Sequence, residues 1–221
     1  MANPLRKLLR PNSAADFTAK LLVKGEIKTA LDIGCGTSSH LQPFRPSLET
    51  TGLDAFKNAI DTSKKHSVHD HYIHADILKD NINAQFDLIT LYGLIEHIPK
   101  SEGIKLLDRI EKLSRKYIIF ETPNGFVPQG PEFGNEFQRH LSGWSIQEFE
   151  SRGYTVFGTT GTRYLRGYMA GPKYNFPGCL FFDELLTLLF QINNNPKHAF
   201  NLVAIKDLRG IPAKYKKEDQ P

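Results

Sequence analysis

Short apolar runs alternate with amphipathic segments along most of this chain. The pattern predicts seven strands, at residues 29–33, 49–53, 72–75, 86–92, 115–121, 154–159 and 200–206. The fourth run is almost continuously apolar, as a central strand of a parallel sheet requires. Helices are predicted before and between the strands, at residues 13–24, 55–65, 101–114 and 145–152. The expected fold class is therefore α/β.

Local signals refine several of these helices. Asn12 or Ser13 is expected to cap the first helix, and Ser145 fits a capping box with Glu148. The helix at residues 101–114 is expected to turn its apolar residues inward, Ile104, Leu107 and Ile110 first among them. Another helix is expected to begin at residues 38–41 and to stay short because two prolines follow.

A glycine-rich loop follows the first predicted strand. Gly34 and Gly36 allow a tight turn with no Cβ in the way of a ligand. In an open α/β sheet, ligands lie beyond the carboxyl ends of the strands, so this loop is expected to form the floor of a binding crevice. Asp32 is poorly suited to an anionic pyrophosphate but suits a positively charged ligand. The alternative is that the two glycines only close a tight turn.

Two further carboxylates follow strand ends. Asp54 lies 18 residues after Gly36, where one carboxylate can accept hydrogen bonds from both hydroxyls of a ribose; the alternative is that it caps the next helix. Asp76 could accept the amine of an adenine while the following N–H, of Ile77, donates to its ring. As the alternative, Asp76 caps the turn before Leu78.

Histidines crowd one region before and within the third predicted strand, at His66, His69, His71 and His74. Their spacing completes no recognisable ligand set with a cysteine or carboxylate. We therefore expect no metal site.

Two irregular segments are candidates for an acceptor site. Residues 122–143 contain three prolines and four glycines, and long irregular segments within compact domains are usually functional. The candidate acceptor contacts here are Phe126 and Trp144, which directly follows the segment. An insertion at residues 161–198 begins with side chains that can stack on a ring or a sugar, Tyr164, Arg166 and Tyr168. Its second half, residues 179–192, is a Leu- and Phe-rich helix, expected as a buried cap, with a homodimer face or a contact with a lipid-like acceptor as alternatives.

Length, charge and cysteine content limit the possible domain organisation, partners and cellular compartment. The 221 residues suit one domain, with an N-terminal helical lid at residues 1–25 and a flexible tail at residues 211–221. The net charge of +4 is scattered, which makes a nucleic-acid partner unlikely. Only two cysteines are present, far apart, which favours a reducing cytoplasm over a disulfide framework. No signal peptide or membrane-spanning run is evident.

Motifs at these strand ends resemble those of the class I S-adenosylmethionine-dependent methyltransferases. In order they are Ala-Leu-Asp-Ile-Gly-Cys-Gly, Gly-Leu-Asp, His-Ala-Asp-Ile, Phe-Asp-Leu-Ile and Glu-His-Ile-Pro, within residues 29 to about 160. The segment from His140 to a Ser-x-x-Glu-Phe sequence looks like the small-molecule branch. The resemblance implies a Rossmann-like, mostly parallel sheet of seven strands, the last antiparallel between the fifth and sixth, with a cap insertion between strands 6 and 7.

The resemblance also implies S-adenosylmethionine as the cofactor and a small molecule as the acceptor of a methyl group on oxygen or nitrogen. The glycine loop would hold the methionine portion, and the segment from Tyr92 to Glu96 would close over the methyl donor. The implied cofactor contacts are Asp32, Gly34, Cys35, Gly36, Asp54, Ala55, Asp76, Ile77, Tyr92 and Glu96.

The chain departs from the family at one position, and its function is open at this stage. Ser38 stands where the family commonly has a third glycine, and this could weaken cofactor binding. A dinucleotide site is disfavoured, because Ser39 replaces the small packing residue and phosphates would meet Asp32. A non-catalytic binding module and an RNA methyltransferase compete with the small-molecule enzyme as interpretations of the same fold.

Two histidines compete for the role of a base if the acceptor is a hydroxyl. His97 lies in the Glu-His-Ile-Pro turn, and His140 lies at the far end of the candidate acceptor loop. We expect His140 to be the base and His97 to support the loop, because a base must face the acceptor rather than the cofactor.

Overall fold

The computed structural model describes residues 13–131 and 135–210. The first half of the expected N-terminal lid, at residues 1–12, and the expected flexible tail, at residues 211–221, lie outside the described residues. Within the described part, no helix is both long enough and apolar enough to cross a bilayer.

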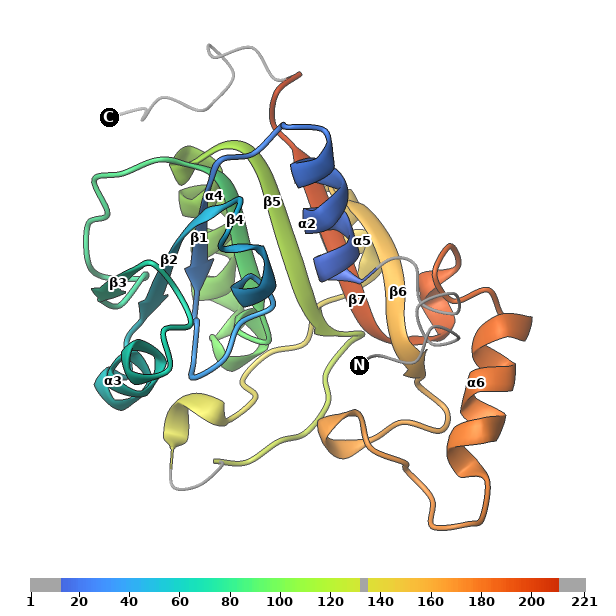
Figure 1. Ribbon diagram of the computed structural model, residues 1–221. Helices are drawn as coiled ribbons and strands as arrows, with labels where there is room; N and C mark the ends of the chain where they lie inside the picture. The colour runs from blue at the N-terminus through green and yellow to red at the C-terminus, as the bar shows by residue number, and fades with distance from the viewer. Residues whose placement is uncertain (1–12, 132–134, 211–221) are drawn as a thin grey trace.

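Seven strands form one sheet at the centre of the fold (Figure 1). They are β1 (Thr29–Ile33), β2 (Glu49–Asp54), β3 (His71–His74), β4 (Phe86–Tyr92), β5 (Ser114–Pro123), β6 (Thr155–Thr162) and β7 (Ala199–Asp207). Their order is β3-β2-β1-β4-β5-β7-β6, and β7 alone runs antiparallel, between β5 and β6. The predicted Rossmann-like sheet and its antiparallel last strand are confirmed.

Five α-helices accompany the sheet in the described residues: α2 (Ala14–Val23), α3 (Lys57–Lys65), α4 (Lys100–Leu113), α5 (Ile146–Glu150) and α6 (Cys179–Leu189). Ser13 caps α2, and its reciprocal partner is Asp16. The predicted capping box of Ser145 and Glu148 is present at the start of α5. These caps satisfy backbone N–H groups that have no partner within the helix.

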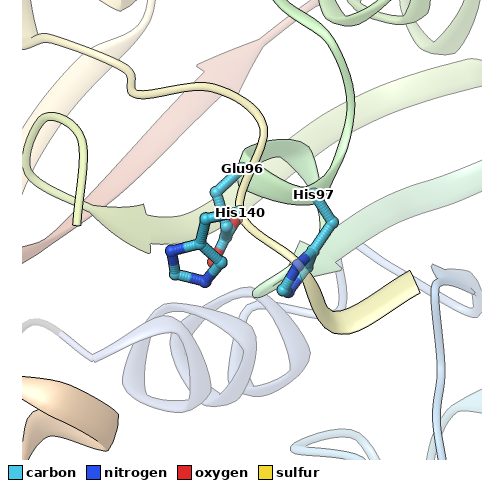
Figure 2. A group of neighbouring side chains, drawn as sticks. All are labelled: Glu96, His97 and His140. Carbon is cyan, nitrogen blue, oxygen red and sulfur yellow. The ribbon is translucent and has the colours of Figure 1, made fainter. Parts of the chain in front are cut away.

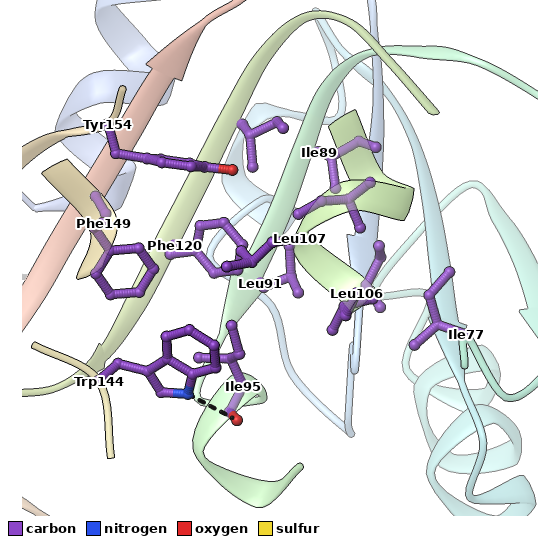
Figure 3. Packing of buried hydrophobic residues seen from close by; sticks show 14 of the residues in the cluster. Ile77, Ile89, Leu91, Ile95, Leu106, Leu107, Phe120, Trp144, Phe149 and Tyr154 are labelled. Carbon is purple, nitrogen blue, oxygen red and sulfur yellow. Dashed lines mark hydrogen bonds between the residues drawn. The ribbon is translucent and has the colours of Figure 1, made fainter. Parts of the chain in front are cut away.

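Each face of the sheet carries its own apolar core. On one face, α2 packs over β1, β4, β5 and β7 (Figure 1). On the other face, α4 and α5 cover the larger core, in which the rings of Phe120, Phe149 and Tyr154 pack together (Figure 3). Burial of apolar surface on both faces makes the strands rigid, so their carboxyl ends form a fixed edge.

Trp144, which was predicted as an acceptor contact, belongs to this core. Its side chain is 1% exposed and stacks on Phe149 with ring centroids 5.7 Å apart. The indole N–H donates to the Ile95 carbonyl at 3.3 Å (Figure 3) and to the Ser142 hydroxyl at 3.0 Å. The indole therefore anchors the returning chain beneath the loop that follows β4.

Two local predictions were wrong. Residues 38–41 begin no α-helix; a single 3-10 turn at Gln42–Phe44 takes its place, because prolines lack the N–H that a longer helix would need. On α4, Ile104 is 44% exposed, while Leu106, Leu107 and Ile110 are buried. The glycine in the preceding position, Gly103, faces the core instead, against the indole of Trp144.

The insertion between β6 and β7 contains α6 and is held by a buried ion pair. Asp183, fully buried, accepts from the Arg166 Nε at 2.5 Å and from the Thr162 backbone N–H at 2.7 Å. Arg166, which was predicted as an acceptor contact, is thus bonded within the insertion. The predicted cap insertion is confirmed, but α6 is not a buried helix. Six of its large apolar side chains are exposed: Leu180, Phe181, Phe182, Leu185, Leu188 and Leu189.

Close packing of the insertion on β6 gives a test of the fold. A Cβ on Gly158 would collide with the Ile192 carbonyl oxygen and lie 2.6 Å from the Ala199 Cβ. We expect Gly158→Ala to lower the free energy of unfolding by about 1–3 kcal/mol, measured by urea denaturation. Gly210→Ala, where a Cβ has nothing within 4 Å, is the control and should change stability little. Equal stability of the two variants would contradict this packing.

Candidate functional site

A pocket of ≈ 290 Å³ lies at the carboxyl ends of β1 and β4. Its lining residues are Asp32, Gly34, Cys35, Ser38, Ser39, His40 and Tyr92. Five of them belong to the loop after β1, one lies on β1 itself and one ends β4. Because β1 and β4 are hydrogen-bonded neighbours, residues that are far apart in the sequence meet here.

Glycine is required at two positions of this loop. Gly34 has φ 71° and Gly36 has φ 55°, in the left-handed region that other residues rarely adopt. A Cβ on Gly34 would also lie 2.8 Å from the Leu94 Cδ1, so the loop after β4 packs directly against the glycine loop. A Cβ on Gly36 would meet nothing within 4 Å. Replacement of Gly36 by another residue would therefore strain the backbone without causing a steric clash.

Asp32 is a buried carboxylate at the wall of the pocket. It is 2% exposed and accepts from the Ser39 hydroxyl at 2.5 Å and from the Thr90 hydroxyl at 2.8 Å. Burial raises its pKa from the usual 3.8 to about 6, against the opposing effect of these hydrogen bonds. Thr90 reaches Asp32 because the two residues are partners in the β1–β4 ladder.

His69 lies beside this carboxylate without neutralising it. Its Nε2 is 3.5 Å from the Asp32 Oδ2, but burial lowers the pKa of His69 to about 4. The imidazole is therefore neutral near pH 7, and the pair is not an ion pair. Sequence reasoning missed Ser39, Thr90 and His69 as neighbours of Asp32. Ser39 is returned by the loop after β1, and strand pairings bring the other two residues there.

The Asp54 carboxylate joins the glycine loop to the end of β2. One oxygen accepts from the Gly36 N–H at 2.9 Å, and the other accepts from the Phe56 N–H at 2.8 Å. Each carboxylate oxygen has a second lone pair, which can accept a hydrogen bond from a ligand hydroxyl. The helix-capping contact of Asp54 is present, and its ribose-binding role stays a prediction.

Asp76 ends β3 in a turn of its own. Its carboxylate accepts from the Leu78 N–H at 2.9 Å and pairs with Lys79 at 3.0 Å. Burial by itself would raise the pKa of Asp76, but these partners hold that pKa below its usual value. The turn-capping alternative is therefore the contact present here, and the side chain is ionised and partly exposed. The two residues predicted beside these carboxylates differ in exposure: Ala55 is partly exposed, and Ile77 is buried.

Tyr92 and Cys35 also line the pocket. The Tyr92 ring meets the His40 ring edge-on, with centroids 4.8 Å apart, and its hydroxyl has no hydrogen-bond partner among the described residues. Cys35 is a free thiol, 3% exposed, and burial raises its pKa to about 12. The thiol therefore stays protonated and serves as a packing group rather than a nucleophile.

A second group of polar side chains lies where the loop after β4 meets the chain before α5. Glu96, His97 and His140 each offer one nitrogen or oxygen atom within 4.8 Å of the others, and their side chains gather at one point (Figure 2). The two imidazole rings meet edge to face at 4.8 Å. The structure thus brings together both histidines that were predicted to compete for the role of base.

Backbone carbonyls fix both imidazoles. The Nδ1 of His97 lies 3.1 Å from the Arg139 carbonyl, and the Nδ1 of His140 lies 2.6 Å from the Val127 carbonyl. A carbonyl only accepts, so each Nδ1 carries the proton and each Nε2 keeps a lone pair. Burial lowers the pKa of both histidines, which keeps them neutral at pH 7. Either Nε2 can therefore accept a proton or bind an electrophile.

Glu96 is 4% exposed, and its Oε2 accepts from the Thr122 hydroxyl at 3.0 Å. Burial raises its pKa to about 7. Its own carbonyl accepts from the N–H groups of Leu141 and Ser142, at 2.8 and 3.0 Å. These bonds hold His140, the residue before Leu141, at the loop after β4.

Several aromatic side chains of the two candidate acceptor segments are exposed. Phe126 is 58% exposed, Phe137 is 59% exposed, and the Phe137 ring lies 6.2 Å from that of Phe56. Tyr164 is 44% exposed and bonds through its hydroxyl to the His198 Nδ1 at 2.6 Å. The side chain of Tyr168 lies outside what the structure describes. Phe126 and Tyr164 are thus available for contacts, and Phe137 joins them as a residue that sequence reasoning did not select.

Comparisons with known proteins agree with this architecture. A family model described as a methyltransferase domain matches residues 6–162. No curated protein matches the chain. A structure of the plantazolicin methyltransferase BpumL, in complex with a monoazolic desmethylPZN analogue and SAH, is 19% identical with a TM-score of 0.55, and 93% of this chain and 85% of that chain are covered.

Two other solved structures are similar at lower identity. The N-methyltransferase NodS from Bradyrhizobium japonicum WM9, in complex with S-adenosyl-L-homocysteine, is 15% identical with a TM-score of 0.53, covering 94% of this chain and 92% of that one. The magnesium protoporphyrin IX methyltransferase ChlM from Synechocystis PCC 6803, with bound SAM, is 13% identical with a TM-score of 0.50, covering 87% and 77%. At these identities the likeness establishes the fold.

The buried charge of Asp32 makes the stability of the unliganded protein depend on pH. Its folded pKa of about 6 lies above the usual 3.8, so ionisation lowers stability as pH rises through this window. We expect Asp32→Asn to stabilise the protein by roughly 2–3 kcal/mol more at about pH 7.5 than at about pH 4. Urea denaturation at both pH values measures the difference. Asp61→Asn, on the exposed face of α3, should not reproduce it; parallel pH curves for wild type and Asp32→Asn would refute the assignment.

Proposed function

This chain belongs to the methyltransferase domain family, and we propose that it transfers a methyl group from S-adenosylmethionine to an oxygen or nitrogen of a small acceptor molecule. The observation that carries the proposal is the glycine-loop pocket with the buried Asp32 at its wall. A cofactor with an ammonium and a sulfonium group, and no phosphate, suits a pocket whose buried charge is negative.

The other strand ends supply the remaining cofactor contacts in this proposal. Asp54 accepts hydrogen bonds from the ribose hydroxyls while its oxygens keep the Gly36 and Phe56 N–H groups. Asp76 accepts from the adenine amine, and Ile77 donates its N–H to the ring. Tyr92 and Glu96 mark the segment that closes over the methyl donor. Ser38 lines the pocket in place of a third glycine and leaves space for the ligand.

The acceptor binds on the side of Glu96, His97 and His140. The acceptor atom attacks the methyl carbon in line with the carbon–sulfur bond, whose electron pair stays on sulfur. A neutral Nε2 facing a hydroxyl can take its proton, and alignment at roughly 3 Å supplies much of the rate. Phe126 and Tyr164, which are exposed near the carboxyl ends of β5 and β6, contact the acceptor.

A non-catalytic module with the same fold is the second candidate, and the apolar face of α6 favours it as a docking surface. The same face supports a homodimer through residues 179–192, because six large apolar side chains on one short helix are unusual at a free surface. A cytoplasmic setting is part of the proposal, and the free thiols of Cys35 and Cys179 agree with it. An RNA acceptor is less favoured because basic residues are scattered.

Isotope transfer separates the enzyme from the binding module. A cell lysate supplied with the protein and methyl-labelled S-adenosylmethionine should yield a labelled small molecule, detected by mass spectrometry. His140→Asn is the matched control for background transfer. A protein that binds the cofactor but yields no labelled product in any extract would support the module.

The role of Asp54 is tested with a change in the ligand as well as in the protein. We expect Asp54→Ala to weaken binding of S-adenosylhomocysteine by about 1–3 kcal/mol, as measured by calorimetry. A 2′-deoxy analogue of this ligand should bind wild type more weakly, but the two ligands should differ little in the variant. This comparison separates ribose binding from the effect of Asp54 on the glycine loop. A full 2′-hydroxyl preference in Asp54→Ala would place the ribose elsewhere.

The roles of the two histidines are tested by separating turnover from cofactor affinity. We expect His140→Asn to reduce kcat by about 10²–10⁴-fold with unchanged affinity for S-adenosylmethionine, since its imidazole faces the acceptor. His97→Asn should mainly weaken the cofactor. The opposite pattern would exchange the two roles, and unchanged kinetics in both variants would mean that alignment alone suffices.

A further inference from the structure

We propose that Glu96, His97 and His140 bind one divalent transition-metal ion, of the kind represented by Zn²⁺. One ligand atom from each residue lies within 4.8 Å of the other two. Two imidazoles and one carboxylate are a frequent donor set for catalytic zinc and for related first-row ions. Within the described residues, the four histidines in and before β3 do not form such a set, and the group comes instead from two distant parts of the chain (Figure 2).

The histidines are prepared as ligands rather than as charged groups. Carbonyls of Val127 and Arg139 hold the Nδ1–H of His140 and His97, respectively. Metal-binding histidines usually donate their second ring N–H in this way, which fixes the tautomer and the ring orientation. Each Nε2 keeps a lone pair, which it can donate to a metal ion.

Glu96 supplies the negative charge that favours a cation. Its carboxylate is buried, and the Thr122 hydroxyl that donates to it carries no charge. Within the described part of the chain, no lysine or arginine forms an ion pair with it. A buried carboxylate without a compensating charge is costly, and a bound divalent ion would remove much of that cost.

The surrounding backbone makes the group a built site. The Glu96 carbonyl accepts from Leu141 and Ser142, and the Ser142 hydroxyl donates to the Ile95 carbonyl at 3.1 Å. Zinc ligands lie about 2.0–2.2 Å from the ion, which places neighbouring ligand atoms about 3–3.5 Å apart. Side-chain rotations that shorten the separations between these atoms by at most about 1.3–1.8 Å are therefore sufficient.

The ion would act on the acceptor, and this role rests on the proposed function. Three protein ligands leave a coordination position for an acceptor hydroxyl, whose pKa the ion lowers. The hydroxyl releases its proton to solvent, and the oxygen pair forms the new bond to the methyl carbon. The carbon–sulfur bond breaks with its pair on sulfur, which becomes a neutral thioether. The histidines then serve as ligands, the ion replaces a free base, and the acceptor class narrows to hydroxyl compounds.

Metal binding is measured first, without cofactor or acceptor. The full-length chain is stripped with a chelator and titrated with Zn²⁺ by calorimetry and with Co²⁺ by visible absorption. We expect one ion per chain and ligand-field bands for Co²⁺, with Mg²⁺ a poor competitor. His97→Gln, His140→Gln and Glu96→Gln should each weaken binding at least tenfold, whereas His71→Gln, which changes an exposed histidine on β3, should not.

Several outcomes would overturn the assignment: no stoichiometric binding, unchanged affinity in both His97→Gln and His140→Gln, or an equal loss in His71→Gln. Circular dichroism checks that each variant is folded, because Glu96 and His97 are also placed beside the cofactor. Because the metal titration needs no cofactor, a site that binds Zn²⁺ in a protein that does not bind S-adenosylhomocysteine would refute the proposed function and leave the metal site standing. Turnover that survives chelation would refute the role in catalysis.

Discussion

Two buried carboxylates at the carboxyl edge of the sheet are the constraint on which the site depends. Asp32 and Glu96 are 2% and 4% exposed, and among the described residues neither is paired with a lysine or an arginine. Burial raises their pKa values to about 6 and about 7. An uncompensated charge in such a place costs several kcal/mol, so the edge of the sheet is poised to gain stability from a cationic ligand.

Hydroxyl groups stand where cations would otherwise be expected. Ser39 and Thr90 donate to Asp32, and Thr122 donates to Glu96. A hydroxyl satisfies a lone pair without cancelling the charge, so each carboxylate keeps its attraction for a positive group. Our proposals assign the cofactor to the first of these charges and a metal ion to the second, on the two sides of a transferred methyl group.

Packing between loops joins the two parts of the site. Leu94, in the loop after β4, fills the space that a side chain on Gly34 would need, and Glu96 follows two residues later. The Glu96 carbonyl also holds the chain that leads from His140 to the buried Trp144. The indole therefore contributes to function through position, by anchoring the returning segment beneath the histidines.

The sequence by itself determined the seven strands, the caps of α2 and α5 and the glycine loop. Each of these depends on local patterns of apolar residues, turns and hydrogen-bonding side chains. It also selected Asp32, Asp54 and Glu96 as residues that follow or end strands. Only the tertiary structure decided what those side chains meet. The pairing of β1 with β4 places Thr90 at Asp32, and the chain before α5 brings His140 to Glu96 and His97. The burial of Trp144 and Arg166 also came only from the tertiary structure, because their residue types suit both binding and packing and burial depends on distant elements.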